Sequence, residues 1–219
     1  MKQIETVKTG KEKQEAYAHS FDTLNKAFQY HFYLEAVAIT YAIMEDRLVA
    51  FLHHAGIVTR DKGDLKINRR FLPHMRLLLG KNPEQVINIK SISVKLSIVS
   101  ACLELTEEKA RSIDDAIARQ LQAKSLRVKA SPDYMLRLFT QINTRLDRQA
   151  VDALLAQIEP WRVQRNQLIH ALMSKTVSAS EASKQECAEA GRILARALDN
   201  ELVKKFKKGN TLRKAYNIQ

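Results

Sequence analysis

Glycine and proline are scarce in this chain, and this scarcity limits the folds open to it more than any other feature. Only 6 glycines and 4 prolines occur among the 219 residues. Glycine permits turns with positive φ and proline interrupts helices, so a chain with few of either and with many strong helix formers favours long helices. The sequence therefore predicts an all-α protein, a helical bundle of about six to eight helices.

Apolar residues recur at helical spacing along most of the chain. We expect helices over residues 11–29, 32–55, 68–79, 87–105, 106–124, from 131 onward, and over 147–159, 160–173 and 181–208. Gly56 is expected to end the second helix and Thr106 to cap the start of another. Pro73 should interrupt or bend its helix, and Pro160 should either open a helix or put a bend between two.

The remaining segments are expected to be loops or turns. Residues 57–67 contain turn-forming residues at 61–64 and are predicted to form a loop. Nothing in the composition forces a domain boundary, so we expect a single domain over residues 1–219. Residues 57–130 would be a helical elaboration of its core, and residues 204–219 a basic C-terminal tail.

The excess of positive charge points to a polyanionic partner. The chain has 36 lysines and arginines against 24 aspartates and glutamates, a formal net charge of +12. Such an excess favours nucleic acid or an acidic protein, and less readily a membrane surface. Six basic residues near the C-terminus form either a solvated tail or part of an RNA-binding surface: Lys204, Lys205, Lys207, Lys208, Arg213 and Lys214.

Cysteine usage and hydropathy indicate a cytoplasmic protein. Cys102 and Cys187 are the only cysteines and form neither a CxxC pair nor a disulfide framework, which suits two inert thiols in a reducing compartment. The N-terminus lacks the apolar run of a secretory signal. No run of 18 or more apolar residues occurs, so we expect no membrane span.

Motifs for cofactor-dependent chemistry are absent from the sequence. It contains no phosphate-binding loop, no GxGxxG, no GxSxG and no HExxH. His53 and His54 are adjacent, and neighbours on a helix point about 100° apart, so they cannot easily share a metal ion. We therefore expect neither a metal nor another cofactor.

The stretch from Pro160 to Met173 holds the candidate functional residues. As a helix it is amphipathic, and Arg165 falls in the middle of its apolar stripe, where a guanidinium needs a partner or a function. Asn166 and His170 lie one turn apart on the flank of that stripe. Glu45, at the edge of the apolar face of the second helix, is a candidate partner that would orient Arg165.

The residues Arg165-Asn166-x-x-x-His170 resemble the signature of the HEPN superfamily (higher eukaryotes and prokaryotes nucleotide-binding domains). Asn directly after Arg at this fixed spacing arises by chance only about 0.02 times in such a chain, against roughly once for the loose signature. Arg69 with His74 and Arg47 with His53 satisfy the loose form. They fail on context, because Pro73 interrupts the first and Arg47 is expected on the outer face of its helix.

The resemblance implies a HEPN-like core, with an inserted helical region, that cleaves RNA without a metal at a dimer interface. His170 would be the general acid or base, and Arg165 would stabilise charge on the phosphate. Asn166 would orient the phosphate or Arg165, and Arg162 could add a backbone contact. The products would be a 2′,3′-cyclic phosphate and a 5′-hydroxyl. Toxins and host-defence effectors of this type imply an antitoxin or regulatory protein as a further partner.

Two other classes of function stay open at this point. The chain could be a HEPN-like module that binds RNA or a nucleotide without catalysis. It could also be a helical scaffold or dimerisation protein whose basic surface meets an acidic partner. A helix-turn-helix DNA-binding protein is not favoured, because no compact three-helix pattern with a recognition helix is found.

Overall fold

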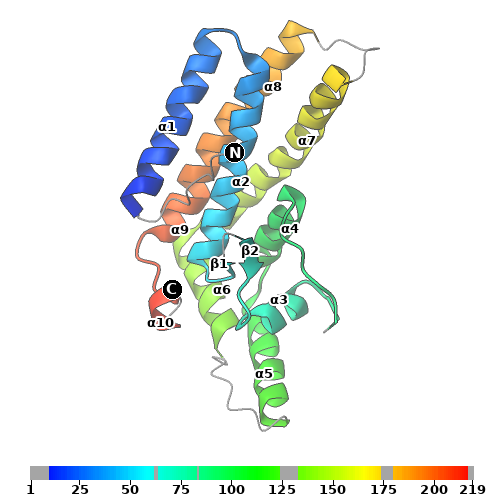
Figure 1. The fold of residues 1–219 in the computed structure, drawn as a ribbon. Helices are drawn as coiled ribbons and strands as arrows, with labels where there is room; N and C mark the ends of the chain where they lie inside the picture. The colour runs from blue at the N-terminus through cyan, green and yellow to red at the C-terminus, as the bar shows by residue number, and fades with distance from the viewer. Residues whose placement is uncertain (1–9, 62–63, 83, 124–132, 174–179, 217–219) are drawn as a thin grey trace. The chain divides into compact units, whose positions relative to one another are not determined.

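The computed structural model describes residues 10–61, 64–82, 84–123, 133–173 and 180–216 (Figure 1). Its contacts divide the chain into two compact units. Unit 1 comprises residues 1–46 and 156–197, and unit 2 comprises residues 47–155 and 198–219. Two long helices, α2 (Tyr33–His54) and α7 (Arg148–Met173), contribute residues to both units. The protein is mostly helical, as the low glycine and proline content predicts.

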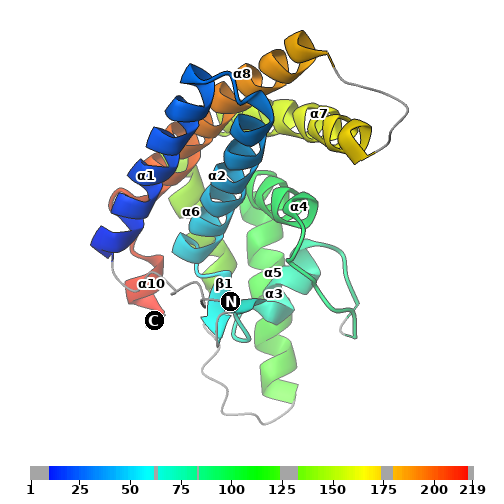
Figure 2. The same cartoon turned by 45° about the horizontal axis from the view of Figure 1, so that its top comes forward.

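Unit 1 is a helical bundle. It contains α1 (Gly10–Gln29), the first part of α2, the second part of α7, and α8 (Glu181–Ala197). Figures 1 and 2 show α1 and α8 running alongside α2. Aromatic contacts join these helices, because Phe28 of α1 meets Tyr33 of α2 edge-on at 6.1 Å, and Arg192 of α8 lies over the Phe28 ring. The second part of α7 contacts this bundle through α2 and α8.

Unit 2 combines shorter helices with a small sheet. Its elements, besides parts of α2 and α7, are β1 (Val58–Asp61), β2 (Asp64–Ile67), α3 (Leu72–Leu78), α4 (Ile92–Leu103), α5 (Glu107–Ala123), α6 (Tyr134–Arg145), η1 (Leu198–Lys204), α9 (Lys205–Lys207) and α10 (Leu212–Ala215). Aromatic side chains from distant segments form its core. Tyr134 stacks on Phe71 at 3.7 Å, and Tyr216 packs edge-on against both rings. The buried Tyr134 hydroxyl donates to the Ala55 carbonyl at 2.9 Å.

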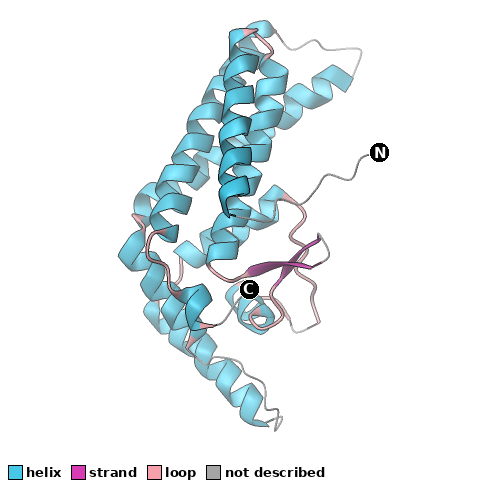
Figure 3. Cartoon of the chain, turned by 60° about the vertical axis from the view of Figure 1, so that its left-hand side comes forward, coloured by secondary structure: helices cyan, strands magenta, loops and turns pink. Residues whose placement is uncertain are grey.

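The prediction of a loop over residues 57–67 is wrong. β1 and β2 pair antiparallel with Val58 opposite Ile67 and Asp61 opposite Asp64, shown in magenta in Figure 3. β1 ends at Asp61 and β2 begins at Asp64, both within the stretch that the sequence marks as a turn. Each strand has four residues, too few for an alternation of apolar and polar residues to stand out in the sequence.

Several predicted helix ends also differ from the structure. α4 begins at Ile92, capped by the Ser91 side chain, rather than at residue 87. α3 begins at Leu72 with Pro73 in its first turn, so this proline starts the helix instead of bending it. α7 continues through Pro160 as one helix. The predicted 181–208 helix is α8 followed by a π-helical turn, η1, and the short α9.

Other predicted ends are confirmed. The Thr106 hydroxyl accepts a hydrogen bond from the Lys109 amide at 3.1 Å, as an N-cap does. Gly56 follows α2 with φ of +80°, and Gly209 follows α9 with φ of +68°. The predicted start of a helix at residue 131 lies outside the described residues.

Candidate functional site

The candidate residues lie on the second part of α7, in unit 1. Arg165 and Asn166 are half-buried, and His170 is exposed. Helix α7 is held in the bundle by Trp161, whose buried indole Nε1 donates to the Cys187 carbonyl of α8 at 2.8 Å. Gly191 of α8 passes so close that a Cβ there would lie 2.7 Å from the Trp161 ring. This close packing fixes the rotation of α7 one turn before Arg165.

The Arg165 guanidinium is held between two neighbours. Its Nη1 donates to the Asn166 side-chain oxygen at 3.0 Å, and its Cζ lies 4.4 Å from the centre of the Tyr41 ring of α2. Its Nε is buried and has no hydrogen-bond partner among the described residues. A cation over an aromatic face is stabilised without losing its charge, so the guanidinium remains able to attract an anion.

Tyr41 is the centre of a small group of charges. Burial raises the pKa of its hydroxyl, and the nearby Glu45 carboxylate raises it further, whereas Arg165 and Arg162 lower it. Glu45 and Arg165 therefore both lie beside Tyr41. The described contacts of the Arg165 guanidinium are with the Asn166 side chain and the Tyr41 ring.

Arg162 is engaged within its own helix. Its Nε and Nη2 donate to the two carboxylate oxygens of Glu159, at 2.9 and 2.5 Å. This pairing raises the pKa of Arg162 and lowers that of Glu159. A contact from Arg162 to a phosphate, as the sequence suggests, would compete with this fork.

Arg165 and His170 leave the helix in different directions. Five residues advance an α-helix by about 500°, so these two side chains project about 140° apart. Asn166 and His170 are four residues apart and share a side of the helix. The hydrogen bond from Arg165 Nη1 to the Asn166 side chain connects the guanidinium with the side of the helix that carries Asn166 and His170. One copy of α7 thus places the amide and the imidazole together and points the guanidinium toward α2.

The C-terminal basic residues belong to unit 2, whereas Arg165 and His170 belong to unit 1. Lys204 pairs with Asp199 at 3.0 Å, and Lys205 pairs with Glu201. Lys207 and Lys208 are exposed. Arg213 Nη1 lies 3.0 Å from His53 Nδ1. The Lys214 side chain lies outside the described residues.

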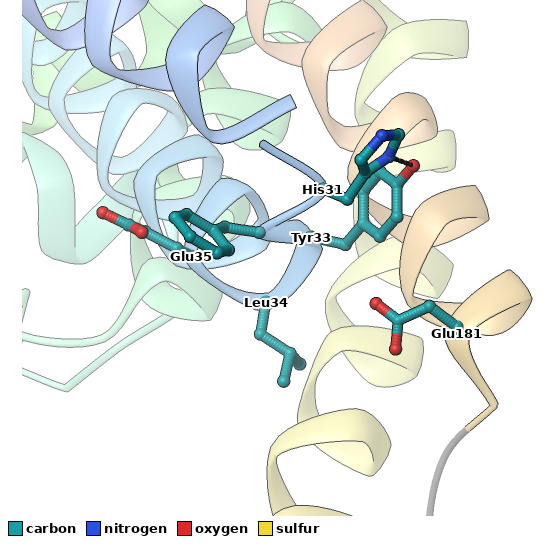
Figure 4. A pocket seen from close by; sticks show the side chains of 6 residues that line it. His31, Tyr33, Leu34, Glu35 and Glu181 are labelled. Carbon is teal, nitrogen blue, oxygen red and sulfur yellow. Dashed lines mark hydrogen bonds between the residues drawn. The ribbon is translucent and has the colours of Figure 1, made fainter. Parts of the chain in front are cut away.

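A pocket of about 340 Å³ opens at the turn between α1 and α2 (Figure 4). His31 has φ of +59°, and its Nδ1 shares a hydrogen bond of 2.8 Å with the Tyr33 hydroxyl. Leu34 and Glu181 also line the pocket. It contains none of the residues that the sequence predicts for the site.

The structure describes neither a metal cluster nor a membrane-crossing helix. Among the described residues, no three histidine, cysteine, aspartate or glutamate side chains are grouped so that they could hold a metal ion. Likewise, none of the helices in the described ranges combines the length and apolar character that crossing a bilayer needs. Burial raises the pKa of the Cys102 thiol to about 12 and that of Cys187 to about 11, so both stay protonated at neutral pH.

Two functional features of this site escape the sequence analysis. Tyr41 is not among the candidate residues from the sequence, although its ring contacts the candidate arginine. The two units also differ in net charge, which a count of charged residues over the whole chain does not show.

Comparison of the chain with protein-family models, with curated proteins and with solved structures finds no match.

Proposed function

We propose that this protein is a metal-independent endoribonuclease of the HEPN type that works as a homodimer in the cytoplasm. One observation carries the proposal. The Arg165 guanidinium lies over Tyr41 and bonds to Asn166, and its buried Nε has no hydrogen-bond partner in the part of the chain that the structure describes. An exposed imidazole, His170, follows Asn166 by one turn. This is the combination of a phosphate-binding cation and a proton-transfer group that RNA cleavage needs.

Arg165 stabilises the phosphate in the proposed reaction. As the ribose 2′-oxygen attacks phosphorus, negative charge builds up on the non-bridging oxygens, and a nearby guanidinium lowers the energy of that state. The Tyr41 ring and the Asn166 oxygen hold the guanidinium before substrate binds. Little conformational entropy is then lost when the phosphate arrives.

His170 moves the proton. The 2′-hydroxyl gives its proton to a base as its oxygen bonds to phosphorus, and the 5′-oxygen takes a proton as its bond to phosphorus breaks. The products are a 2′,3′-cyclic phosphate and a 5′-hydroxyl. Imidazole titrates close to physiological pH, so a histidine suits either transfer.

A second copy of the chain completes the proposed site. Because Arg165 and His170 project about 140° apart on one helix, the guanidinium of one copy and the imidazole of the other can face a phosphate between two α7 helices. Val163, on the same helix, is an exposed apolar side chain that such a contact would bury. A toxin or host-defence role, with an antitoxin or regulatory protein as partner, belongs to the same proposal.

The test is RNA cleavage in EDTA. Purified protein is incubated with total RNA and with tRNA, beside Arg165→Ala, Asn166→Ala and His170→Ala, and Gln167→Ala serves as the control on an exposed position of α7. We expect the His170 and Arg165 variants to lose about 10²–10⁴-fold in rate, with cyclic phosphate ends on the wild-type products. Activity that requires Mg²⁺, or that survives both substitutions, contradicts the proposal.

Mixing two inactive variants tests the composite site. If each site takes Arg165 from one copy and His170 from the other, a dimer of Arg165→Ala with His170→Ala has one intact site. Random pairing then restores about a quarter of the wild-type rate. If one copy supplies both groups, the mixture stays inactive.

A second candidate function is RNA or nucleotide binding without catalysis. The divergent directions of Arg165 and His170 within one copy favour it, because binding needs only the guanidinium. RNA retained by the wild type, lost on Arg165→Ala and never cleaved would establish this function. A stable dimer without any RNA interaction would leave a helical scaffold.

A further inference from the structure

The two units differ sharply in net charge. Unit 1 contains 11 lysines and arginines and 11 aspartates and glutamates, so its formal charge is zero. Unit 2 contains 25 lysines and arginines against 13 aspartates and glutamates and therefore has the full +12 of the chain. The excess charge thus lies in the unit that does not contain Arg165, Asn166 and His170.

Within unit 2, four cations form what we call the C-terminal cation cluster: Arg70, Arg145, Lys207 and Lys208. Arg70 and Arg145 come from distant segments, and both bond to the C-terminal segment. Arg70 Nη1 donates to the Tyr216 carbonyl at 2.7 Å, and Arg145 Nη1 donates to the Lys208 carbonyl. The Lys207 and Lys208 side chains are exposed, and Lys208 is the residue whose carbonyl Arg145 contacts.

The C-terminal segment is itself fixed to the body of unit 2. The Asn210 side-chain amide donates to the His54 carbonyl at 3.0 Å, and Leu212 and Tyr216 are buried. The backbone to which the cluster arginines bond is therefore held in place by the core of unit 2.

The positive charges of Arg70 and Arg145 are not compensated by their described partners, which are neutral oxygens. Arg145 Nε donates to the Gln141 side-chain oxygen at 2.9 Å, and its guanidinium lies against Gly209, where a Cβ would be 2.9 Å from Nη1. Among the described residues, none of the four cations forms an ion pair with a carboxylate. Elsewhere in unit 2, by contrast, Arg111 pairs with Glu107 and Arg137 with Asp133.

We propose that unit 2 binds the phosphate backbone of nucleic acid through the C-terminal cation cluster, independently of Arg165 and His170. Guanidinium groups held in place by neutral acceptors match phosphate oxygens and lose little entropy on binding. The inference goes beyond the proposed function, since it needs no cleavage. Binding to the phosphate backbone does not depend on the nucleotide sequence and does not distinguish RNA from DNA.

Nucleic acid fits this surface better than a membrane does. A protein that binds at a membrane surface usually inserts apolar side chains into the bilayer. Among the described residues of unit 2, the exposed large apolar side chains are Leu77 and Val86, and neither adjoins the cluster in sequence or by a described contact. A polymer with one phosphate per nucleotide instead matches a set of fixed cations that has no apolar component.

The test measures the affinity of full-length protein for a fluorescent 20-nucleotide RNA and for DNA of the same sequence by anisotropy between 50 and 200 mM salt. The cluster variant is Arg70→Gln, Arg145→Gln, Lys207→Gln and Lys208→Gln. The matched control removes four other exposed cations of unit 2: Arg60→Gln, Lys90→Gln, Lys109→Gln and Arg119→Gln. Both variants have the same net charge, and circular dichroism checks that both fold.

We expect the cluster variant to lose about 100-fold in affinity at 50 mM salt and to lower the salt slope by about 3, close to 0.7 for each lost contact with a single strand. The matched control should lose less than about 10-fold. Gln167→Ala, at an exposed position of α7 in unit 1, should bind like the wild type. An equal loss in the two fourfold variants overturns the inference.

One further variant separates geometry from charge. In Gly209→Asn the new asparagine tolerates the positive φ of this position, but the added Cβ displaces the Arg145 guanidinium. We expect a loss of about 3–10-fold in affinity at unchanged net charge, one charge-assisted contact being lost. Unchanged affinity contradicts a role for the fixed arginine.

Stronger binding to polyglutamate or to phosphatidylserine vesicles than to RNA would assign the surface to an acidic protein or a membrane and overturn the proposal.

Discussion

The Arg165 guanidinium carbon lies 4.4 Å from the centre of the Tyr41 ring, so a cation of α7 rests on an aromatic face of α2. The bond from Arg165 to Asn166 lies beside that contact. The ring therefore both supports the bundle and orients the candidate site, and these two roles can be separated by substitution.

Tyr41→Phe should leave the kcat/KM of RNA cleavage within about twofold of the wild-type value and should not change the free energy of unfolding, because the aromatic face is kept. Tyr41→Leu should lower kcat/KM by about 3–30-fold, corresponding to a cation–π contact of about 0.5–2 kcal/mol. The measurement is the cleavage rate at several RNA concentrations, together with urea unfolding. Equal activity of the Phe and Leu variants would exclude a role for the ring in positioning Arg165.

Gly191→Ala should destabilise the protein although alanine is the better helix former. The new methyl group would meet the Trp161 ring at 2.7 Å and the Thr40 side chain at 2.8 Å. Overpacking of this kind costs about 1–3 kcal/mol, whereas the helix propensity gains about 1 kcal/mol. Urea unfolding measures the difference, and Ile193→Ala, on the exposed side of α8, is the control expected within about 0.5 kcal/mol of wild type.

Trp161→Phe removes the buried hydrogen bond to the Cys187 carbonyl while keeping an aromatic ring. We expect a loss of about 1–3 kcal/mol in the free energy of unfolding, since the carbonyl is left without its donor. Thermal unfolding followed by circular dichroism is the measurement. A midpoint equal to that of the wild type would mean that water replaces the indole.

Asp199 should be more important for stability than its neighbour Glu201. Asp199 is 4% exposed and pairs with Arg47 at 3.1 Å and Lys204 at 3.0 Å, whereas the Glu201 carboxylate is more exposed and pairs with Lys205. Asp199→Ala leaves Arg47 without this carboxylate and should cost about 3–5 kcal/mol. Glu201→Ala should cost less than about 1 kcal/mol. Equal losses in urea unfolding would contradict the difference in burial.

His74 and Asp114 should give opposite dependences of stability on pH. Both are buried, with His74 Nε2 3.7 Å from an Asp114 oxygen that also accepts the Met135 amide hydrogen. Burial lowers the pKa of His74 to about 4 and raises the pKa of Asp114 to about 6. Protonation of His74 therefore favours the unfolded chain, and ionisation of Asp114 does the same.

The sign of each effect follows from the folded and unfolded pKa values. The contribution of His74 is present above its unfolded pKa of 6.5 and is lost as pH falls toward 4. The contribution of Asp114 is present below its unfolded pKa of 3.8 and is lost as pH rises through 6. In urea unfolding from pH 4 to 7, the stability of wild type relative to His74→Gln should rise with pH, and relative to Asp114→Asn it should fall. Parallel curves would contradict both shifts.

The sequence predicts the helices of this fold well where apolar spacing is regular and a cap residue is local. α1, α2 and α5 begin and end within a few residues of the predicted limits. The strands are missed because their four-residue length gives no usable period. η1 is missed because no residue pattern marks a π-helical turn in a sequence.

The candidate site is predicted only in part for a similar reason. A charge on an apolar stripe marks Arg165 in the sequence, and the structure gives it a half-buried position. Its contact with Tyr41 joins two helices that are far apart in the chain, and spacing along one helix cannot predict such a partner. Arg47, expected on the outer face of α2, instead pairs with Asp199, which is 152 residues away. The chemistry assigned to Arg165, Asn166 and His170 stays a prediction.

Pro160 has a mechanical consequence for α7. Proline has no amide hydrogen, so the carbonyl of Ala156, four residues earlier, receives no bond from it along the helix. Ala156 is also the residue at which the contacts of α7 change from unit 2 to unit 1. Pro160→Ala would supply this carbonyl with an amide donor inside the 26-residue helix.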